Sequence, residues 1–156
     1  MRETLHEGVA GFVERSCADR LDQYVDLLAH HYGRTRNVDK QQVWVRAAGD
    51  AAKTAFANQA AVDHYERLLP LLSEPQPGEV LLELGAVWQL TGRWADAERA
   101  HLRAMGAAER TGSRHTLAAS RRDMGVLAPY TRPTAEAVRW LSEARPTSSG
   151  STIQRV

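Results

Sequence analysis

Apolar side chains recur along most of the chain at steps of three and four residues, the spacing that places them on one face of an α-helix. One such stripe consists of Ala61, Tyr65, Leu68 and Leu72. An earlier stripe consists of Leu21, Tyr24, Val25, Leu28 and Tyr32. Runs of β-branched residues that favour strands are nearly absent, and the nearest approach, residues 43–45, is short. The pattern therefore predicts an all-α protein.

The stripes also recur as a larger unit. The clearest unit comprises Leu81, Leu84, Gly85 and Trp88, followed by Ala97, His101 and Ala104. The same spacing one unit upstream gives Val45, Ala48, Gly49 and Ala52, followed by Ala61, Tyr65 and Leu68. One unit downstream it gives Arg121, Met124, Gly125 and Ala128, followed by Ala137, Leu141 and Ala144. The alanines that open the second helices are 36 and then 40 residues apart, a period typical of helical-repeat proteins.

Each unit is interpreted as two antiparallel helices joined by a short turn. The turns expected within the units are residues 56–58, 91–93 and 129–133, and a further turn between units is expected at 73–78. Gly92 readily adopts the left-handed conformation that ends a helix, and Pro133 cannot continue one. The turn residues and the apolar stripes thus divide the chain at the same places.

A glycine recurs inside the first helix of every unit, at Gly49, Gly85 and Gly125. Each glycine costs about 1 kcal/mol relative to alanine in a helix interior. We therefore expect a close helix crossing at these positions, where a side chain would be in the way. The residues expected opposite the glycines are Ala61, Ala97 and Ala137.

The array Leu-x2-Leu-Gly-x2-Trp of residues 81–88, followed by Ala-x3-His-x2-Ala of residues 97–104, resembles the tetratricopeptide repeat. His101 stands where that repeat usually has an aromatic residue, and the proline that often closes it is absent. The resemblance implies a tetratricopeptide-like α-solenoid. Two amphipathic segments precede the first unit, so about eight antiparallel helices are expected. They would form one domain, residues 1–145, with a disordered tail at residues 146–156.

A closer resemblance covers roughly residues 5–145. The stretches that carry it are residues 18–22, 27–32, 46–52 and 64–70. They resemble the helical region that follows the ATPase module in bacterial class III adenylate or guanylate cyclases fused to AAA-type or STAND ATPases, and in related transcriptional regulators. In that family the helical repeats are thought to sense or to scaffold. The resemblance implies a fragment, or a free-standing relative, of such a signalling protein.

Charge and composition exclude several other classes. The chain has 20 basic and 19 acidic side chains, interleaved, whereas a nucleic-acid-binding surface requires clustered Lys and Arg. Arg114, Arg121 and Arg122 form the densest basic group and are interpreted as a solvated helix face. Cys17 is the only cysteine. The first residues lack a secretory signal and no stretch has the roughly 20 apolar residues of a membrane span, so we expect a cytoplasmic protein without membrane contact.

The sequence offers little catalytic or metal-binding chemistry. It contains no Gly-x4-Gly-Lys-Ser/Thr phosphate loop, no Gly-x-Ser-x-Gly elbow and no His-Glu-x2-His or Cys-x2-Cys spacing. His30 and His31 are adjacent, so on a helix they point about 100° apart. His64 and His101 occupy second helices of neighbouring units and are expected in the core or groove. We therefore expect no enzyme activity, no cofactor and no metal.

A protein-binding groove is the leading functional hypothesis, because stacked helix pairs curve and commonly bind partners on the concave face. The residues expected to line it, on the first helices of the units, are Arg46, Asp50, Lys53, Glu79, Gln89 and Arg122. Core packing is expected for most of the tryptophans (Trp44, Trp88, Trp94 and Trp140), but Trp94 follows a turn and is a candidate surface anchor. The partner would be another protein or a neighbouring domain of a larger regulator.

Two alternatives stay open. A small molecule lodged between helix pairs would alter their stacking, which would make the domain a ligand sensor for an attached ATPase or transcription regulator. Alternatively, the chain is the remnant of a truncated gene without an independent role. In that case the last helix, which carries Val138 and Leu141, would lack a capping helix and favour self-association.

Overall fold

The structure is a computed structural model of the chain, and it describes residues 2–73, 76–131, 138–139 and 142–143. Every regular element in this described part is helical, which confirms the all-α fold class. The elements, in chain order, are α1 (Arg2–Ser16), η1 (Leu21–Tyr24), α2 (Val25–Tyr32), α3 (Val38–Thr54), α4 (Asn58–Leu68), η2 (Leu69–Leu71), α5 (Gln76–Leu90), α6 (Trp94–Thr111) and α7 (Arg114–Thr131), where η denotes a 3₁₀-helix.

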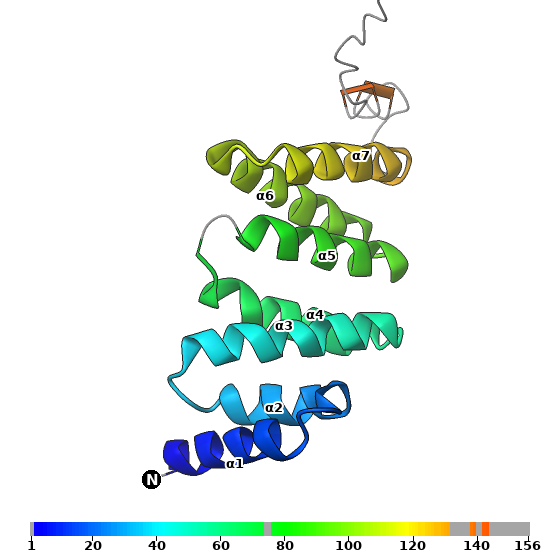
Figure 1. Cartoon of the computed structure of the whole chain (residues 1–156). Coiled ribbons are helices and arrows are strands. Elements are labelled where there is room, and N and C mark those ends of the chain that lie inside the picture. Colours follow the sequence, from blue (N-terminus) through cyan, green and yellow to red (C-terminus); the bar gives the residue numbers. More distant parts are fainter. Residues whose placement is uncertain (1, 74–75, 132–137, 140–141, 144–156) are drawn as a thin grey trace, which may run out of the picture.

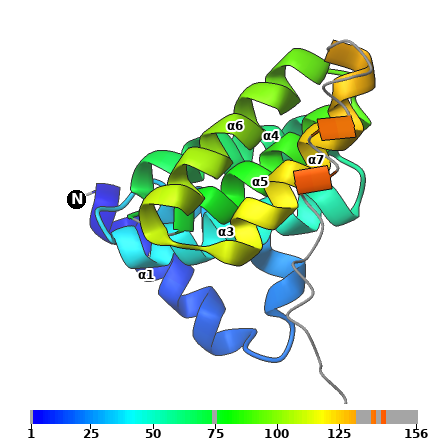
Figure 2. The same cartoon turned by 90° about the horizontal axis from the view of Figure 1, so that it is seen from above.

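The helices are stacked in chain order, from α1 at the bottom of Figure 1 to α7 at the top. Each helix packs on the next one along the chain, and α5 also contacts α7. α3, α5 and α7 run in one direction while α4 and α6 return (Figure 1). The α3–α4 and α5–α6 turns and the end of α7 therefore lie on one edge of the stack. Figure 2, which looks down the stack, shows that successive layers are rotated relative to one another.

The positions aligned between the units belong to the core. Every one of them within the described residues is buried, except Ala52 and Arg121, which are half-buried. Trp44 and Trp88 are buried as well, as expected. Burying a large apolar side chain such as that of Leu68 or Leu84 stabilises the fold by roughly 1.5–3 kcal/mol, so the matched positions contribute to holding successive helices together.

Gly49 and Gly85 do mark close helix crossings, but the nearest side chains opposite them are not the expected alanines. A Cβ atom added to Gly49 would lie 2.8 Å from the Tyr65 ring, and one added to Gly85 would lie 2.5 Å from the His101 ring. These rings come four residues after Ala61 and Ala97, one helical turn further along the partner helix. A ring reaches further than a methyl group, and it therefore fills the space that glycine leaves. Ala137, expected opposite Gly125, lies outside the described residues.

Helices extend into two of the predicted turns, both of which contain prolines. Helix α5 begins at Gln76, so Pro77 lies in its first turn, where the missing N–H has no intrahelical acceptor anyway. Helix α7 continues through Pro129 to Thr131. The turns after α3 and α5 occur where they were expected. The eighth expected helix and the tail after residue 145 fall on, or largely on, residues outside those described.

The carboxylate of Glu14 joins helix α1 to its neighbours. It accepts hydrogen bonds from the Tyr32 hydroxyl at 2.8 Å, the Lys40 ammonium at 2.7 Å and the Trp44 indole N–H at 2.8 Å. Burial alone would raise the pKa of Glu14, but these donors outweigh it and hold the pKa below its usual value. Burial and the adjacent carboxylate raise the pKa of Tyr32 to about 12. The network joins α1, α2 and α3.

Candidate interaction surface

The polar faces of α3 and α5 meet along one side of the stack. Arg46 of α3 pairs with Glu79 of α5 at 3.4 Å and with Asp50 on its own helix at 4.0 Å. Lys53 of α3 pairs with Glu83 of α5. Between these pairs lies a depression of about 530 Å³, lined by Arg46, Asp50, Lys53, Thr54, Phe56 and Glu83. Four of the expected groove residues (Arg46, Asp50, Lys53 and Glu79) are thus brought together here.

One of these residues also supports the core. Asp50 accepts a hydrogen bond from the hydroxyl of Tyr65 at 2.7 Å, and Tyr65 is fully buried against Gly49. Burial, together with this bond to a carboxylate, raises the pKa of Tyr65 far above its ordinary value, so the hydroxyl stays protonated and remains a donor. The side chain of Asp50 is therefore committed to the α3–α4 crossing and only partly available to a partner.

Gln89 is committed in a similar way. Its side-chain nitrogen lies 3.2 Å from Nε2 of His101, which is fully buried between α5, α6 and α7. Burial lowers the pKa of His101, more than the nearby carboxylate of Asp123 raises it, so the imidazole is neutral at pH 7. A neutral ring lets Nε2 accept from the Gln89 amide. Arg122, in contrast, has a side chain that is 66% exposed and pairs with Asp123 at the surface at 2.9 Å.

Phe56 lines the same depression at its turn edge, and sequence reasoning missed it. Its backbone has a φ of 57°, in the left-handed region, where Gly92 has 71° in the corresponding turn 36 residues later. The N–H groups of Phe56 and Ala57 donate to carbonyl oxygens in the last turn of α3 at 3.0 and 2.9 Å. Those of Gly92 and Arg93 do the same at the end of α5, at 3.1 and 2.9 Å. The two turns are the same Schellman-type helix ending, with phenylalanine in place of glycine.

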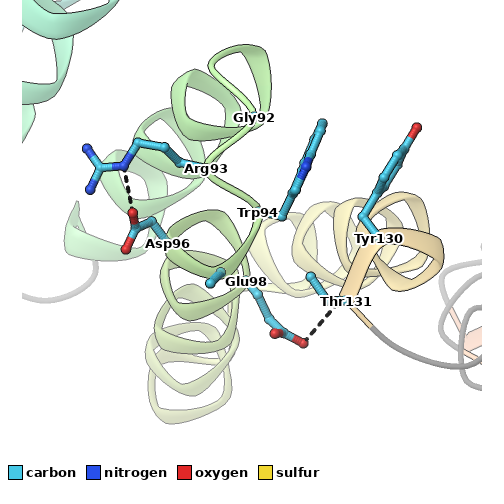
Figure 3. A pocket seen from close by; sticks show the side chains of 8 residues that line it. Gly92, Arg93, Trp94, Asp96, Glu98, Tyr130 and Thr131 are labelled. Carbon is cyan, nitrogen blue, oxygen red and sulfur yellow. Dashed lines mark hydrogen bonds and ion pairs between the residues drawn. The ribbon is translucent and has the colours of Figure 1, made fainter.

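A second hollow of about 540 Å³ lies on the same edge of the stack, between the α5–α6 turn and the end of α7. Figure 3 shows its aromatic wall, in which Trp94 and Tyr130 are stacked with ring centroids 4.4 Å apart and planes at 11°. Tyr130 is 62% exposed. Arg93 pairs with Asp96 at 2.6 Å on the other side of the turn. Trp94, the expected surface candidate, is thus half-buried and shares one ring face with Tyr130.

His6, His30 and His31 form one cluster, with ring centroids 5.0–6.3 Å apart, whereas His64 and His101 lie elsewhere. His64 faces Asp26 of α2, with its Nε2 atom 3.6 Å from the carboxylate, while His101 faces α5 and α7. His6 and His31 lie in contact, with their Nδ1 atoms 3.0 Å apart. Within residues 2–73, 76–131, 138–139 and 142–143, no group of three or more His, Cys, Asp or Glu side chains is arranged to hold a metal ion.

The chain matches no protein-family model, and a search of curated proteins finds no significant relative. None of the helices in the part of the chain that the structure describes combines the length and the apolar character that crossing a lipid bilayer requires. What the fold defines is therefore a class: an all-α protein whose helices pack on one another in chain order.

Proposed function

We propose that this chain is a protein-interaction module of the tetratricopeptide type, which binds a partner protein over the polar faces of α3, α5 and α7. The repeated units, the burial of their matched positions and the stacking of helices in chain order support this reading. The proposal includes a tetratricopeptide-like α-solenoid. Its association with bacterial cyclase- or ATPase-linked regulators rests on the sequence resemblance alone.

Phe56 is the observation that carries the proposal. A phenylalanine in the left-handed region costs about 1–2 kcal/mol relative to a relaxed backbone. Burial of the ring offsets little of this cost, because the residue is 77% exposed. Glycine, which occupies the corresponding turn, would avoid this cost. A large aromatic side chain held outward at the end of a charged depression is the arrangement of an anchor for a partner protein.

The remaining groove residues fit a partner of mixed charge. Arg46, Lys53 and Arg122 supply positive charge, and Asp50 and Glu79 supply negative charge, each within or beside an existing ion pair. Surface ion pairs contribute only about 0–1 kcal/mol to stability, so a partner can exchange them for its own contacts at low cost. Such charges orient a partner segment, while Phe56 contributes apolar contact area.

The test compares partner capture by the intact chain and by two variants, Phe56→Ala and Arg122→Ala, with Glu109→Ala as the control. Glu109 is an exposed residue of α6, so its removal tests the effect of losing any surface charge. Proteins of the source organism retained by the wild-type chain and by the control, but lost from both variants, would support the proposal. Equal retention by all four chains, each shown to be folded by circular dichroism, would contradict it.

A second candidate function is the sensing of a small molecule between helix pairs. One observation favours it: a cavity between α2 and α4, which belong to neighbouring helix pairs, has five polar or charged residues in its lining. A ligand in that cavity would contact both helix pairs.

A further inference from the structure

An open-mouthed cavity of about 650 Å³ lies between α4 and α2, and its lining includes the residues that follow α2. Its lining consists of Asp26, His30, Gly33, Arg34, Ala60, His64 and Arg67. Cavities of roughly 300–1,000 Å³ are the usual size for small-molecule sites. Most of the lining is polar or charged, so the cavity suits a polar molecule and not an apolar one.

The fixed charges of the lining favour an anion. Two guanidinium groups, those of Arg34 and Arg67, face a single carboxylate, that of Asp26, which gives a net charge of 2 − 1 = +1. Asp26 lies beside His64 at 3.6 Å. Arg34 donates to the carbonyl oxygen of His30 at 2.9 Å. Among the described residues, neither arginine has a carboxylate ion-pair partner, whereas Arg46, Arg93 and Arg122 each have one.

Glycine at position 33 allows Arg67 to reach across from α4 to α2. A Cβ atom at Gly33 would lie 2.7 Å from Nη2 of Arg67 and 2.8 Å from the carbonyl oxygen of Ala29. The guanidinium therefore lies directly against the end of α2, in space that a side chain would take. This places it on the same side of the cavity as Arg34, and two guanidinium forks are well suited to bind the oxygens of a carboxylate or a phosphoryl group.

The His64 ring lines the cavity on the α4 side. Burial lowers the pKa of His64, more than the Asp26 carboxylate raises it, and the Arg67 guanidinium lowers it further. An anion bound beside the ring would raise the pKa of His64.

We propose that this cavity binds a small polar molecule through a phosphoryl or carboxylate oxyanion, which Arg34 and Arg67 bind together at the C-terminal end of α2, with His64 beside it. The volume exceeds what a bare oxyanion fills, so the ligand carries a polar body next to its anionic group. Because Arg34 follows α2 and Arg67 belongs to α4, the ligand bridges two helices that are not consecutive in the chain. Binding therefore stabilises the N-terminal half of the stack.

The experiment titrates the purified 156-residue chain at pH 7.0 with three probes: inorganic phosphate, glycerol 3-phosphate and succinate. Sodium chloride at matched ionic strength corrects for charge screening. The readouts are the thermal midpoint and the NMR resonances of the histidine rings. The variants are Arg67→Gln and Arg34→Gln, and the matched control is Arg103→Gln, which removes the same charge from an exposed position on α6.

The proposal expects a saturable rise in midpoint and a shift of the His64 ring resonances with at least one oxyanion but not with chloride. Arg67→Gln and Arg34→Gln should each bind the oxyanion at least about tenfold more weakly than the wild type, because each loses a charged hydrogen bond. The affinity of Arg103→Gln should be unchanged. Binding of glycerol 3-phosphate but not succinate would identify a phosphoryl ligand, and the reverse a carboxylate.

Two results would overturn the proposal. The first is a response to chloride that equals the response to every oxyanion. The second is an Arg67→Gln variant that is less stable but binds the oxyanion as tightly as the wild type. In that case the guanidinium only offsets the negative end of the α2 helix dipole, an effect worth about twofold to fivefold in a folding equilibrium constant.

Discussion

Replacing Gly85 with alanine tests whether the recurring glycines exist to let helices cross closely. The new Cβ atom would lie 2.5 Å from Cε1 and 2.6 Å from Nε2 of His101. Ordinary carbon contacts begin near 3.5 Å, so the ring or the helix must move by about 1 Å. The ring is fully buried and its Nε2 atom is held by Gln89. The strain therefore cannot be relieved by turning the ring into solvent.

The magnitude follows from three terms. Overpacking a core costs about 1–3 kcal/mol, and disturbing the bond between Gln89 and His101 costs about 1 kcal/mol more. Alanine in place of glycine returns about 1 kcal/mol of helix propensity. Gly85→Ala should therefore lower the free energy of unfolding by about 1–3 kcal/mol, which corresponds to a fall of roughly 2–10 °C in Tm for a chain of this size.

Gly8→Ala is the matched control, because a Cβ atom at Gly8 of α1 meets nothing within 4 Å. This variant should gain up to about 1 kcal/mol from helix propensity alone. Urea denaturation followed by far-ultraviolet circular dichroism measures the free energy of unfolding of both variants. In the background of His101→Ala, which opens the space, Gly85→Ala should lose most of its cost. A Gly85→Ala chain stabilised as much as Gly8→Ala would refute the close crossing.

Three further outcomes are expected. Phe56→Gly should raise the free energy of unfolding by about 0.5 kcal/mol, because the relief of left-handed strain exceeds the entropy that glycine adds to the unfolded chain. Phe56→Ala keeps the strain and should not raise it. Equal stability of the two variants in urea would contradict this expectation. Glu14→Ala should cost about 2–3 kcal/mol, because buried donors lose a charged acceptor, and an unchanged urea midpoint would count against the α1 network. The folded chain lowers the pKa values of His31, His64 and His101 below 6.5. The stability that these rings contribute is therefore complete above pH 6.5 and is lost as the pH falls below it, because the unfolded chain then binds more protons. The contribution of Glu14, whose pKa is lowered from 4.5, is lost below pH 4.5. A Tm that stays constant from pH 7.5 to 5.5 would show that these rings are not held neutral.

The sequence allowed the helices and their core to be predicted because both depend on periodicity. Val45, Leu84 and Met124, for example, were matched by spacing alone and are all buried. The predicted contacts opposite Gly49 and Gly85 were wrong by one helical turn. Spacing identifies the face of a helix, but it does not tell whether a methyl group or a longer ring from that face reaches the neighbouring backbone.

The candidate site was predictable only in part. The charged residues of α3 and α5 were selected by their place between core positions, and several meet as ion pairs. Gln89 was selected in the same way, yet its amide is engaged with the buried His101. Phe56 was missed, although a signal existed: it stands 36 residues before Gly92, where the same turn uses glycine. The cavity between α2 and α4 depends on the packing of distant residues, Gly33 against Arg67 among them, which no local pattern reveals.

The most direct test of the interaction surface places a photo-crosslinking amino acid at position 56 of the chain, and in a parallel sample at Glu109 on the exposed side of α6. After irradiation in an extract of the source organism, mass spectrometry identifies what is attached. The proposed function predicts a distinct partner protein crosslinked from position 56 and not from position 109, with the yield reduced when Arg122→Ala is added. The same proteins from both positions, or no crosslink from position 56, would contradict it.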